Sequence, residues 1–296
     1  MKKVLITGCS GMLGNVLADE FYLKGQSILG VDLRKPNNDI PFTKLDLTQS
    51  LATISLLEVI HPEIIIHTAA YTDVDFCERN PEITNKLHIE ATKLLSDYSN
   101  SRAKLVFISS DSVFEGTLGN YKEDDNKNPI NYYARSKDIA EEIIKTSCDD
   151  YLIVRTNIFG FHQNHGKSLV EWALSKLTTG QKINGFVDVR FNAIYTRFLS
   201  RILLNMIELD LKGTYHVCSS NSLSKFEFLT KLATIFKLNV DLISPMKVVE
   251  FCLQTNRPNN TTLNVEKIHS LIELPSIEDG LFELYADYSK FKLLNI

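Results

Sequence analysis

A tyrosine and a lysine stand four residues apart in the segment Tyr133-Ala134-Arg135-Ser136-Lys137. On a helix, residues at this spacing share one face, so we expect the phenol and the ammonium to lie side by side. An ammonium near a phenol favours the phenolate and is expected to lower the tyrosine pKa from its ordinary value of about 10. Such a tyrosine can exchange a proton with a reacting carbonyl or alcohol oxygen.

Two serines, Ser109 and Ser110, follow the apolar run from Leu105 to Ile108. A short apolar run without polar alternation is typical of a strand that is buried on both faces of a parallel sheet. A hydroxyl at the carboxyl end of this strand can hydrogen-bond the substrate oxygen that Tyr133 protonates. The pattern therefore indicates an oxidoreductase site.

A glycine-rich turn near the N-terminus predicts a dinucleotide site. Glycines recur at Gly8, Gly11 and Gly14, directly after the apolar run Val4-Leu5-Ile6 and before an amphipathic segment. Gly8 would permit a tight turn, Gly11 would let backbone N–H groups approach a pyrophosphate, and Gly14 would allow close helix–sheet packing. The predicted cofactor contacts in this turn are Gly8, Ser10, Gly11, Met12, Leu13 and Gly14.

The residues after the second predicted strand give two opposed signals about the cofactor. Asp32 stands 24 residues beyond Gly8, where a carboxylate binds the adenosine ribose hydroxyls of NAD. Arg34 and Lys35 follow at once, and an arginine here can hold the 2′-phosphate of NADP. The sequence therefore predicts NADP or NAD and leaves the choice between them open.

The elements that must position these residues alternate along the first half of the chain. Short apolar runs at residues 4–6, 28–31, 64–66, 105–108 and 152–154 are separated by stretches of helical periodicity. This alternation predicts an α/β fold with a doubly wound parallel Rossmann sheet and right-handed crossovers. In such sheets, ligands bind at the carboxyl ends of the strands.

The alternation of short apolar runs and helical stretches becomes less regular after about residue 160. Helices are expected near residues 167–179, 195–209 and 224–237, with a strand at 214–217 and an irregular remainder. We therefore predict an NAD(P)-binding Rossmann domain at residues 1–160. A smaller substrate-binding lobe at 161–296 would be partly interleaved with the sheet domain.

Composition excludes several classes of protein. The net charge of −4 gives no reason to expect nucleic acid or an anionic membrane as a partner, and no stretch approaches the ~18 apolar residues of a membrane span. The five cysteines are scattered without a Cys-x-x-Cys pair, so we expect no disulfide framework, no metal site, and a cytoplasmic location. The sequence leaves a homodimer open. His162 and His165 fall in a predicted loop and are expected to be surface residues.

Six stretches carry a resemblance that spans nearly the whole chain. They are Thr7–Gly14, His67–Asp75, Ile108–Gly116, Tyr133–Lys137, Arg155–Gly160 and Arg257–Asn264. The chain resembles the extended short-chain dehydrogenase/reductases and, within them, the dTDP-4-dehydrorhamnose reductases and their relatives. The resemblance implies reduction of a keto group at C4 of a nucleotide-linked deoxysugar.

The resemblance also assigns roles to matching positions. It implies a catalytic triad of Ser110, Tyr133 and Lys137, with Lys137 also binding the nicotinamide ribose. Arg257 would hold the substrate diphosphate, because a guanidinium binds phosphate bidentately and a lone buried arginine would be costly without an anion. The other implied contacts are Asp46 and Leu47 beside the adenine, Ala69, Ala70 and Tyr71 under the dinucleotide, and Asp111, Asn157 and Ile158 at the sugar.

The chain also departs from the family pattern. His67 stands where the family usually has Asn, Ile194-Tyr195-Thr196 where it often has a Pro-Thr pair, and Ile158 where its dTDP-sugar enzymes tend to have an aromatic residue. These changes leave the particular sugar undecided. Two other functions stay open at this point.

The first alternative is a sugar-nucleotide epimerase or dehydratase. The related dehydratases carry Asp-Glu after the hydroxyl residue, whereas this chain has Asp111-Ser112. Reductase-epimerases that make GDP-fucose carry a cysteine at the position of Asp111. The second alternative is a non-catalytic NADP-binding regulatory subunit like that of methionine adenosyltransferase, since a fold does not fix a function.

Overall fold

A computed structural model describes residues 2–162 and 168–294, with side chains up to residue 288. Its centre is a seven-stranded sheet in the order β11-β6-β5-β4-β1-β2-β3, and every neighbouring pair is parallel. The strands are β1 (Lys3–Thr7), β2 (Ser27–Asp32), β3 (Phe42–Lys44), β4 (Ile64–His67), β5 (Lys104–Ser110), β6 (Tyr151–Thr156) and β11 (Gly213–His216). The predicted parallel Rossmann sheet is therefore confirmed.

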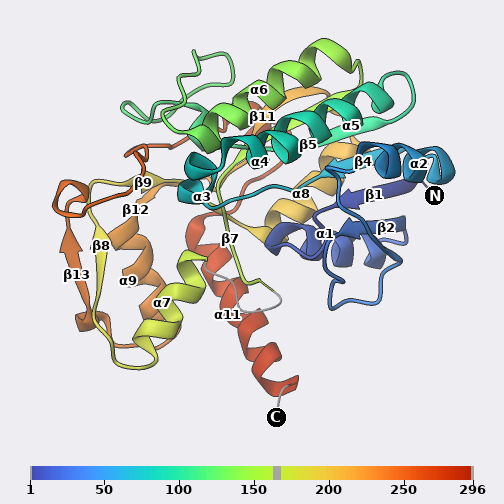
Figure 1. Cartoon of the computed structure of the whole chain (residues 1–296). Helices are drawn as coiled ribbons and strands as arrows, with labels where there is room; N and C mark the ends of the chain where they lie inside the picture. Colours follow the sequence, from blue (N-terminus) through green and yellow to red (C-terminus); the bar gives the residue numbers. More distant parts are fainter. Residues whose placement is uncertain (1, 163–167, 295–296) are drawn as a thin grey trace.

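Both faces of the sheet are covered, as the unbroken apolar runs predict. Side chains alternate across a strand, so Ile64 and Ile66 pack into one hydrophobic cluster and Ile65 into another. Helices α2, α5 and α6 lie on one face, and α1 and α8 lie together on the other (Figure 1). These helices are α1 (Met12–Leu23), α2 (Ser50–Ile60), α5 (Ala91–Ser99), α6 (Tyr132–Ser147) and α8 (Thr196–Glu208).

Shorter helices join β4 to α5. They are α3 (Val74–Arg79), α4 (Pro81–Asn85) and a single π-helical turn, η1 (Lys86–Glu90). A 3₁₀ turn, η2 (Asp111–Val113), follows β5 directly. Both segments bring polar side chains to the carboxyl edge of the sheet.

The C-terminal part of the chain builds a second hydrophobic cluster beside the sheet (Figure 1). The helices of this cluster are α7 (Leu169–Leu177), α9 (Lys225–Ile235) and α11 (Ile277–Leu294), whereas α10 (Glu266–His269) packs Ile268 into a cluster of the sheet domain. Small strand pairs complete the C-terminal part: β7 (Ile158–Phe159) with β10 (Ile194–Tyr195), β9 (Arg190–Phe191) with β12 (Leu223–Ser224), and β8 (Ile183–Phe186) with β13 (Ile243–Met246).

The expectation of an irregular remainder is wrong. Helix α11 runs over 18 residues and buries Ile277, Leu281 and Leu284. Gly280 lies inside its first turns, where a side chain would collide with the Phe159 ring. Glycine weakens the helical signal of the sequence, yet this packing contact requires it.

The chain after α9 also returns to the sheet domain. Asn260 N–H donates to Gly116 O at 2.8 Å, and Arg190 N–H donates to Asn259 O at 2.7 Å. This crossing segment carries Arg257 to the mouth of the site. The boundary predicted at residues 160 and 161 stays a prediction.

Within the described ranges, no helix has both the length and the apolar character needed to cross a membrane. All five cysteines are free thiols; Cys252 is exposed and the other four are buried.

Candidate active site

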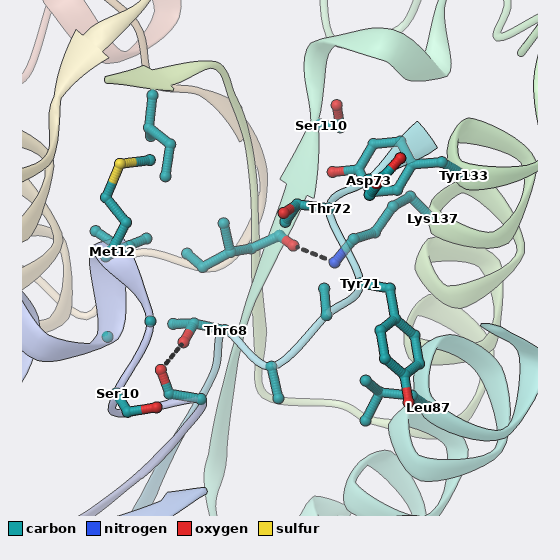
Figure 2. Close-up of a pocket in the computed structure, with 18 of the residues that line it drawn as sticks. Ser10, Met12, Thr68, Tyr71, Thr72, Asp73, Leu87, Ser110, Tyr133 and Lys137 are labelled. Atoms are coloured by element: carbon teal, nitrogen blue, oxygen red, sulfur yellow. Dashed lines mark hydrogen bonds between the residues drawn. The ribbon is translucent and has the colours of Figure 1, made fainter. Parts of the chain in front are cut away.

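One cavity of about 980 Å³ lies at the carboxyl ends of the central strands (Figure 2). It gathers every residue that the sequence predicts for the site. They are Gly8, Ser10, Gly11, Met12, Leu13, Gly14, Asp32, Arg34, Asp46, Leu47, Ala69, Ala70, Tyr71, Ser110, Asp111, Tyr133, Lys137, Asn157, Ile158 and Arg257. Gly8 and Arg257, which are 249 residues apart in the sequence, thus line the same cavity.

The glycine turn is shaped for close approach of backbone to ligand. Gly8 has a φ of 69°, and a Cβ there would lie 2.7 Å from Ala69 N. A Cβ on Gly14 would lie 2.1 Å from Gly8 O, so only glycine lets α1 start against the strand end. No described side chain caps the N-terminus of α1 at Gly11, so the amides of Met12 and Leu13 are available to an anion in the cavity.

The acidic residue at the end of β2 is tied to the glycine turn. Asp32 Oδ2 accepts from Ser10 N–H at 2.9 Å and from Ser10 Oγ at 2.8 Å. One carboxylate oxygen is therefore held by the turn. Arg34 lies exposed on the cavity wall beyond it. Farther along, Asp46 Oδ1 accepts from Thr48 N–H and Thr48 Oγ1, which fixes the loop at the predicted adenine end.

The structure separates the two serines at the end of β5. Adjacent strand residues point to opposite faces, and the Ser109 hydroxyl is taken up by the buried Glu141, to which its Oγ donates at 2.5 Å. Ser110 Oγ donates to Asp111 Oδ1 at 3.1 Å. Ser110 is therefore the serine whose hydroxyl lies beside the Tyr133 phenol (Figure 2).

Helix α6 places the tyrosine and the lysine on one face, as their spacing predicts. Asn131 caps the helix by accepting from Ala134 N–H at 3.0 Å, which sets Tyr133 at the second helical position. Lys137 is buried, and its Nζ donates to Ile108 O at 3.0 Å and lies 4.6 Å from the centre of the Phe107 ring. Figure 2 shows Ser110, Tyr133 and Lys137 together at one side of the cavity.

The prediction that Lys137 lowers the pKa of the Tyr133 phenol is wrong. Burial raises the pKa of Tyr133 to about 12, and a hydrogen bond with Ser110 only partly offsets it, while the Asp111 carboxylate adds to the rise. Burial also lowers the pKa of Lys137 to about 8, although Glu141 opposes that shift. Both groups lose solvation on folding, which spacing alone does not reveal.

The predicted sugar contacts form a second polar pair. Asp111 is buried, and its Oδ2 accepts from Asn157 Nδ2 at 2.7 Å. Asn157 comes from the end of β6 and Asp111 from η2, so two neighbouring strand ends supply the pair. Ile158 lines the cavity beside them.

The expectation of a buried, unpaired arginine at Arg257 is wrong. The Arg257 side chain is 46% exposed, and its Nη2 donates to Asp75 Oδ2 at 3.0 Å. Arg257 still lines the cavity, so an anion entering there would compete with Asp75.

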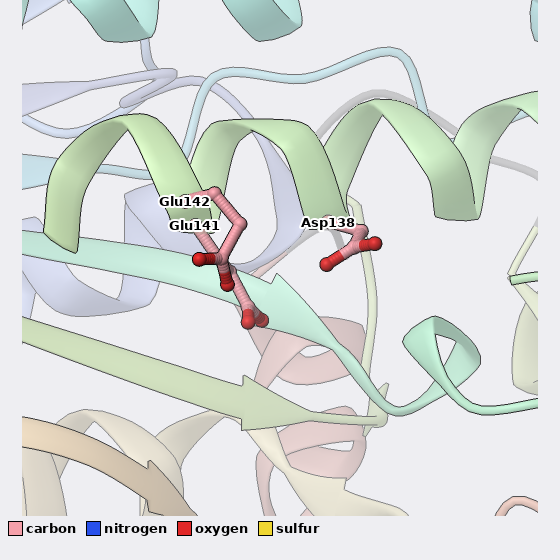
Figure 3. Close-up of side chains that lie close together, drawn as sticks. All are labelled: Asp138, Glu141 and Glu142. Carbon is pink, nitrogen blue, oxygen red and sulfur yellow. The ribbon is translucent and has the colours of Figure 1, made fainter. Parts of the chain in front are cut away.

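Two further groups have partners that the sequence does not predict. His162 lines the cavity, and its Nδ1 lies 2.7 Å from Glu171 Oε2; His165 lies outside the described residues. Asp138, Glu141 and Glu142 gather on α6 (Figure 3), where the Lys127 ammonium contacts all three carboxylates. Arg155 also pairs with Glu141 and Lys145 with Glu142, so three cations of the chain itself bind the three carboxylates.

Sequence reasoning missed two residues of the cavity wall. Thr72 and Asp73, between β4 and α3, line the cavity (Figure 2). Asp73 also caps α3 by accepting from Phe76 N–H at 3.0 Å. The rule that ligands bind after strand ends could have found both, because they follow β4 within a few residues.

With this geometry in place, comparison with known proteins gives the family. The model of the RmlD substrate binding domain matches residues 1–290. The chain belongs to this family. The resemblance to dTDP-4-dehydrorhamnose reductases is thereby confirmed, and it covers the C-terminal lobe as well as the sheet.

Curated relatives of two kinds match the chain. The chain is 28% identical over 294 residues to a probable low-salt glycan biosynthesis reductase of Haloferax volcanii, covering 97% of this chain and 98% of the relative. It is 27% identical over 278 residues to methionine adenosyltransferase 2 subunit beta of Danio rerio, covering 91% and 85%.

Solved structures of dTDP-4-dehydrorhamnose reductases also match the chain. A dTDP-4-dehydrorhamnose reductase from Bacillus anthracis, solved in complex with NADP, matches with a TM-score of 0.88 at 29% identity, covering 97% of this chain and 99% of that one. A hypothetical dTDP-4-dehydrorhamnose reductase from Sulfolobus tokodaii matches with a TM-score of 0.82 at 30% identity, covering 94% and 98%.

Proposed function

We propose that this chain is an oxidoreductase that reduces a keto group, at C4, of a nucleotide-linked deoxysugar with NADPH or NADH. The observation that carries the proposal is the placement of Ser110, Tyr133 and Lys137 in the cavity that the glycine turn opens. The relatives named as reductases support the same reaction.

The residues present fit a nicotinamide dinucleotide. The uncapped start of α1 would take the pyrophosphate, and Asp32 or Arg34 would bind the adenosine ribose or its 2′-phosphate. Asp46 and Leu47 would flank the adenine, and Ala69, Ala70 and Tyr71 would lie under the dinucleotide. When bound, the reduced nicotinamide supplies a hydride to the carbonyl carbon.

Tyr133 would complete the reduction as general acid. Its hydroxyl gives a proton to the carbonyl oxygen as negative charge develops there, and solvent later returns a proton to the phenolate. Ser110 would donate a hydrogen bond to the same oxygen. The Lys137 ammonium would stabilise the phenolate and bind the nicotinamide ribose.

The remaining cavity residues would hold the sugar nucleotide. The hydrogen-bonded pair of Asp111 and Asn157 offers fixed polar atoms to sugar hydroxyls. Arg257 would exchange Asp75 for the diphosphate, at small cost because a half-exposed ion pair contributes at most about 1 kcal/mol.

The relatives named as a methionine adenosyltransferase subunit favour a second function, that of a subunit of another enzyme. Turnover separates the two. Purified protein should oxidise NADPH or NADH when mixed with a nucleoside diphosphate 4-keto-6-deoxysugar, and the product should be the corresponding alcohol. Tight binding of NADPH without oxidation across a panel of such sugars would contradict the proposal and favour the subunit function.

The homodimer and the cytoplasmic location stay predictions. The mass measured by gel filtration would test the homodimer.

A further inference from the structure

Two buried histidines lie behind the cavity and have no place in the reaction described above. His67 ends β4, and His88 lies in the π-helical turn η1. Their relative exposures are 1% and 2%. Burial lowers the pKa of His67 to about 3 and that of His88 to about 2, with the nearby Lys137 charge adding to both shifts, so both rings are neutral.

The partners of His88 fix its tautomer. Tyr71 N–H donates to His88 Nε2 at 2.8 Å, and a backbone N–H can only donate, so Nε2 is the acceptor and the proton is on Nδ1. His88 Nδ1 lies 2.8 Å from Ser136 Oγ, and that hydroxyl donates to Tyr133 O at 2.7 Å. The Nδ1–H therefore donates to Ser136.

The same reasoning fixes the tautomer of His67. Thr92 Oγ1 donates to His88 O at 2.7 Å, so it accepts from His67 Nε2–H at 3.1 Å. His67 Nδ1 then accepts from Thr7 Oγ1 at 2.7 Å. Two runs of hydrogen bonds thus meet at His88. One leads from Thr7 through His67 and Thr92 to the main-chain carbonyl of His88, and the other leads from the His88 ring through Ser136 to the main-chain carbonyl of Tyr133. Together they join β1, β4, α5, η1 and α6.

The ring of His88 lies between the two parts of the site. Its centroid is 6.0 Å from the Tyr71 ring in a stacked arrangement and 6.0 Å from the Tyr133 ring in an edge-on arrangement. The π-helical turn changes the helical register at this residue, and such turns are frequent at functional sites.

We propose that His88 is a positioning residue that links the backbone under the dinucleotide, at Tyr71, to the proton donor Tyr133 through Ser136. His88 Nε2 binds the Tyr71 N–H, which we call the Tyr71 arm, and His88 Nδ1 binds Ser136, which we call the Tyr133 arm. Cofactor binding and the placement of Tyr133 therefore share one rigid ring. The inference rests on the proposed function for the meaning of the Tyr133 arm, whereas the Tyr71 arm requires only dinucleotide binding.

Two amide substitutions separate the arms. The Gln amide reaches the place of Nε2, so His88→Gln keeps an acceptor for Tyr71 and loses the donor to Ser136. The Asn amide reaches the place of Nδ1, so His88→Asn keeps that donor and loses the acceptor. Ser136→Ala removes only the Tyr133 arm. Because it deletes a single hydroxyl, it keeps the test available if the histidine variants fold poorly. His61→Asn, at an exposed left-handed position, is the matched control.

His88→Gln and Ser136→Ala should lower kcat about three- to tenfold, the effect of one neutral hydrogen bond, while the Kd for NADPH stays near that of the parent. His88→Asn should weaken NADPH about three- to tenfold with kcat near the parent. In NMR of isotope-labelled tyrosine, the Tyr133 signal should move in the first two variants and stay in the third.

Equal losses of kcat and NADPH affinity in both amide variants, in step with their melting temperatures, would show a merely structural role and overturn the inference. The NADPH affinities and the Tyr133 signal need no sugar substrate. If they split as expected while no keto-sugar is reduced, the proposed function fails and the link through His88 stands.

Discussion

The Lys137 ammonium donates a hydrogen bond to the main-chain carbonyl of Ile108, with 3.0 Å between Nζ and O. This contact anchors the lysine to the strand that ends at Ser110, so α6 and β5 present their groups in a fixed relation. It also directs the charge toward a carbonyl dipole. Burial holds the pKa of the Tyr133 phenol at about 12, so the phenol is protonated at neutral pH, which is the form a proton donor needs.

Tyr133→Phe should lower turnover by at least ~100-fold, the usual contribution of a general acid, because it removes the proton and keeps the ring. Steady-state rates and NADPH titration of the same preparation check this. The Kd for NADPH should stay near the parent value. Turnover close to that of the parent would show that Tyr133 is not the proton donor.

The pH dependence of reduction should report Lys137. Its pKa is lowered to about 8, so the ammonium that stabilises the phenolate and binds the ribose is lost as the pH rises past that value. We expect kcat/KM to fall above about pH 8, with the phenol still protonated. Lys137→Arg should remove this alkaline limb, since a guanidinium does not deprotonate in proteins. An unchanged limb in that variant would assign it to another group.

Stability should fall in mild acid because three buried histidines are neutral in the folded protein. The pKa values of His67, His88 and His216 are lowered by burial to about 3, 2 and 3. Their stabilising contribution is complete above the unfolded pKa of about 6.5 and is lost as the pH falls below it. Each would remove at most about 1.4 kcal/mol per pH unit from the free energy of unfolding.

Urea unfolding between pH 6.5 and 5 measures this dependence. His67→Asn removes one titrating ring and should make the slope shallower by about a third, since one of three histidines is gone. An unaltered slope would mean that His67 is protonated in the fold.

The sheet and the cavity wall could be predicted because their signals are local. Ile64, Ile65 and Ile66 are apolar at every position, which only a strand covered on both faces requires. The glycine spacing and the pair Tyr133 and Lys137 are likewise set by short-range geometry.

What escaped prediction depends on contacts between distant segments. Asp75 and Arg257 are 182 residues apart, and nothing near either residue signals their ion pair. Gly280 weakens the helical pattern of α11 because it makes room for Phe159. The high pKa of Tyr133 follows from burial by the whole fold.

Arg34→Ala should weaken NADPH far more than NADH, because only NADPH carries a 2′-phosphate. A charge-assisted hydrogen bond contributes roughly 1.5–3 kcal/mol, which is about ten- to 150-fold in Kd. Both oxygens of Asp32 already accept hydrogen bonds, from Ser10 and from Leu33 N–H, whereas Arg34 is an exposed cation on the same cavity wall. Fluorescence titration with both cofactors measures the ratio. Equal losses of affinity for NADPH and NADH, or no loss of either, would show that Asp32 alone sets the cofactor preference.

Arg257→Ala should raise the KM for a sugar nucleotide by about ten- to 150-fold, the loss of one charge-assisted contact of roughly 1.5–3 kcal/mol. The turnover number should change less, because the diphosphate is bound alike in ground and transition states.

Asp75→Asn is the informative partner variant, because it frees the Arg257 guanidinium. The KM for the sugar nucleotide should therefore stay the same or fall. If Arg257 serves only to pair with Asp75, both variants would lose a little thermal stability and keep the parent KM, since a half-exposed ion pair contributes at most about 1 kcal/mol. A raised KM in Arg257→Ala alone would assign the arginine to the substrate.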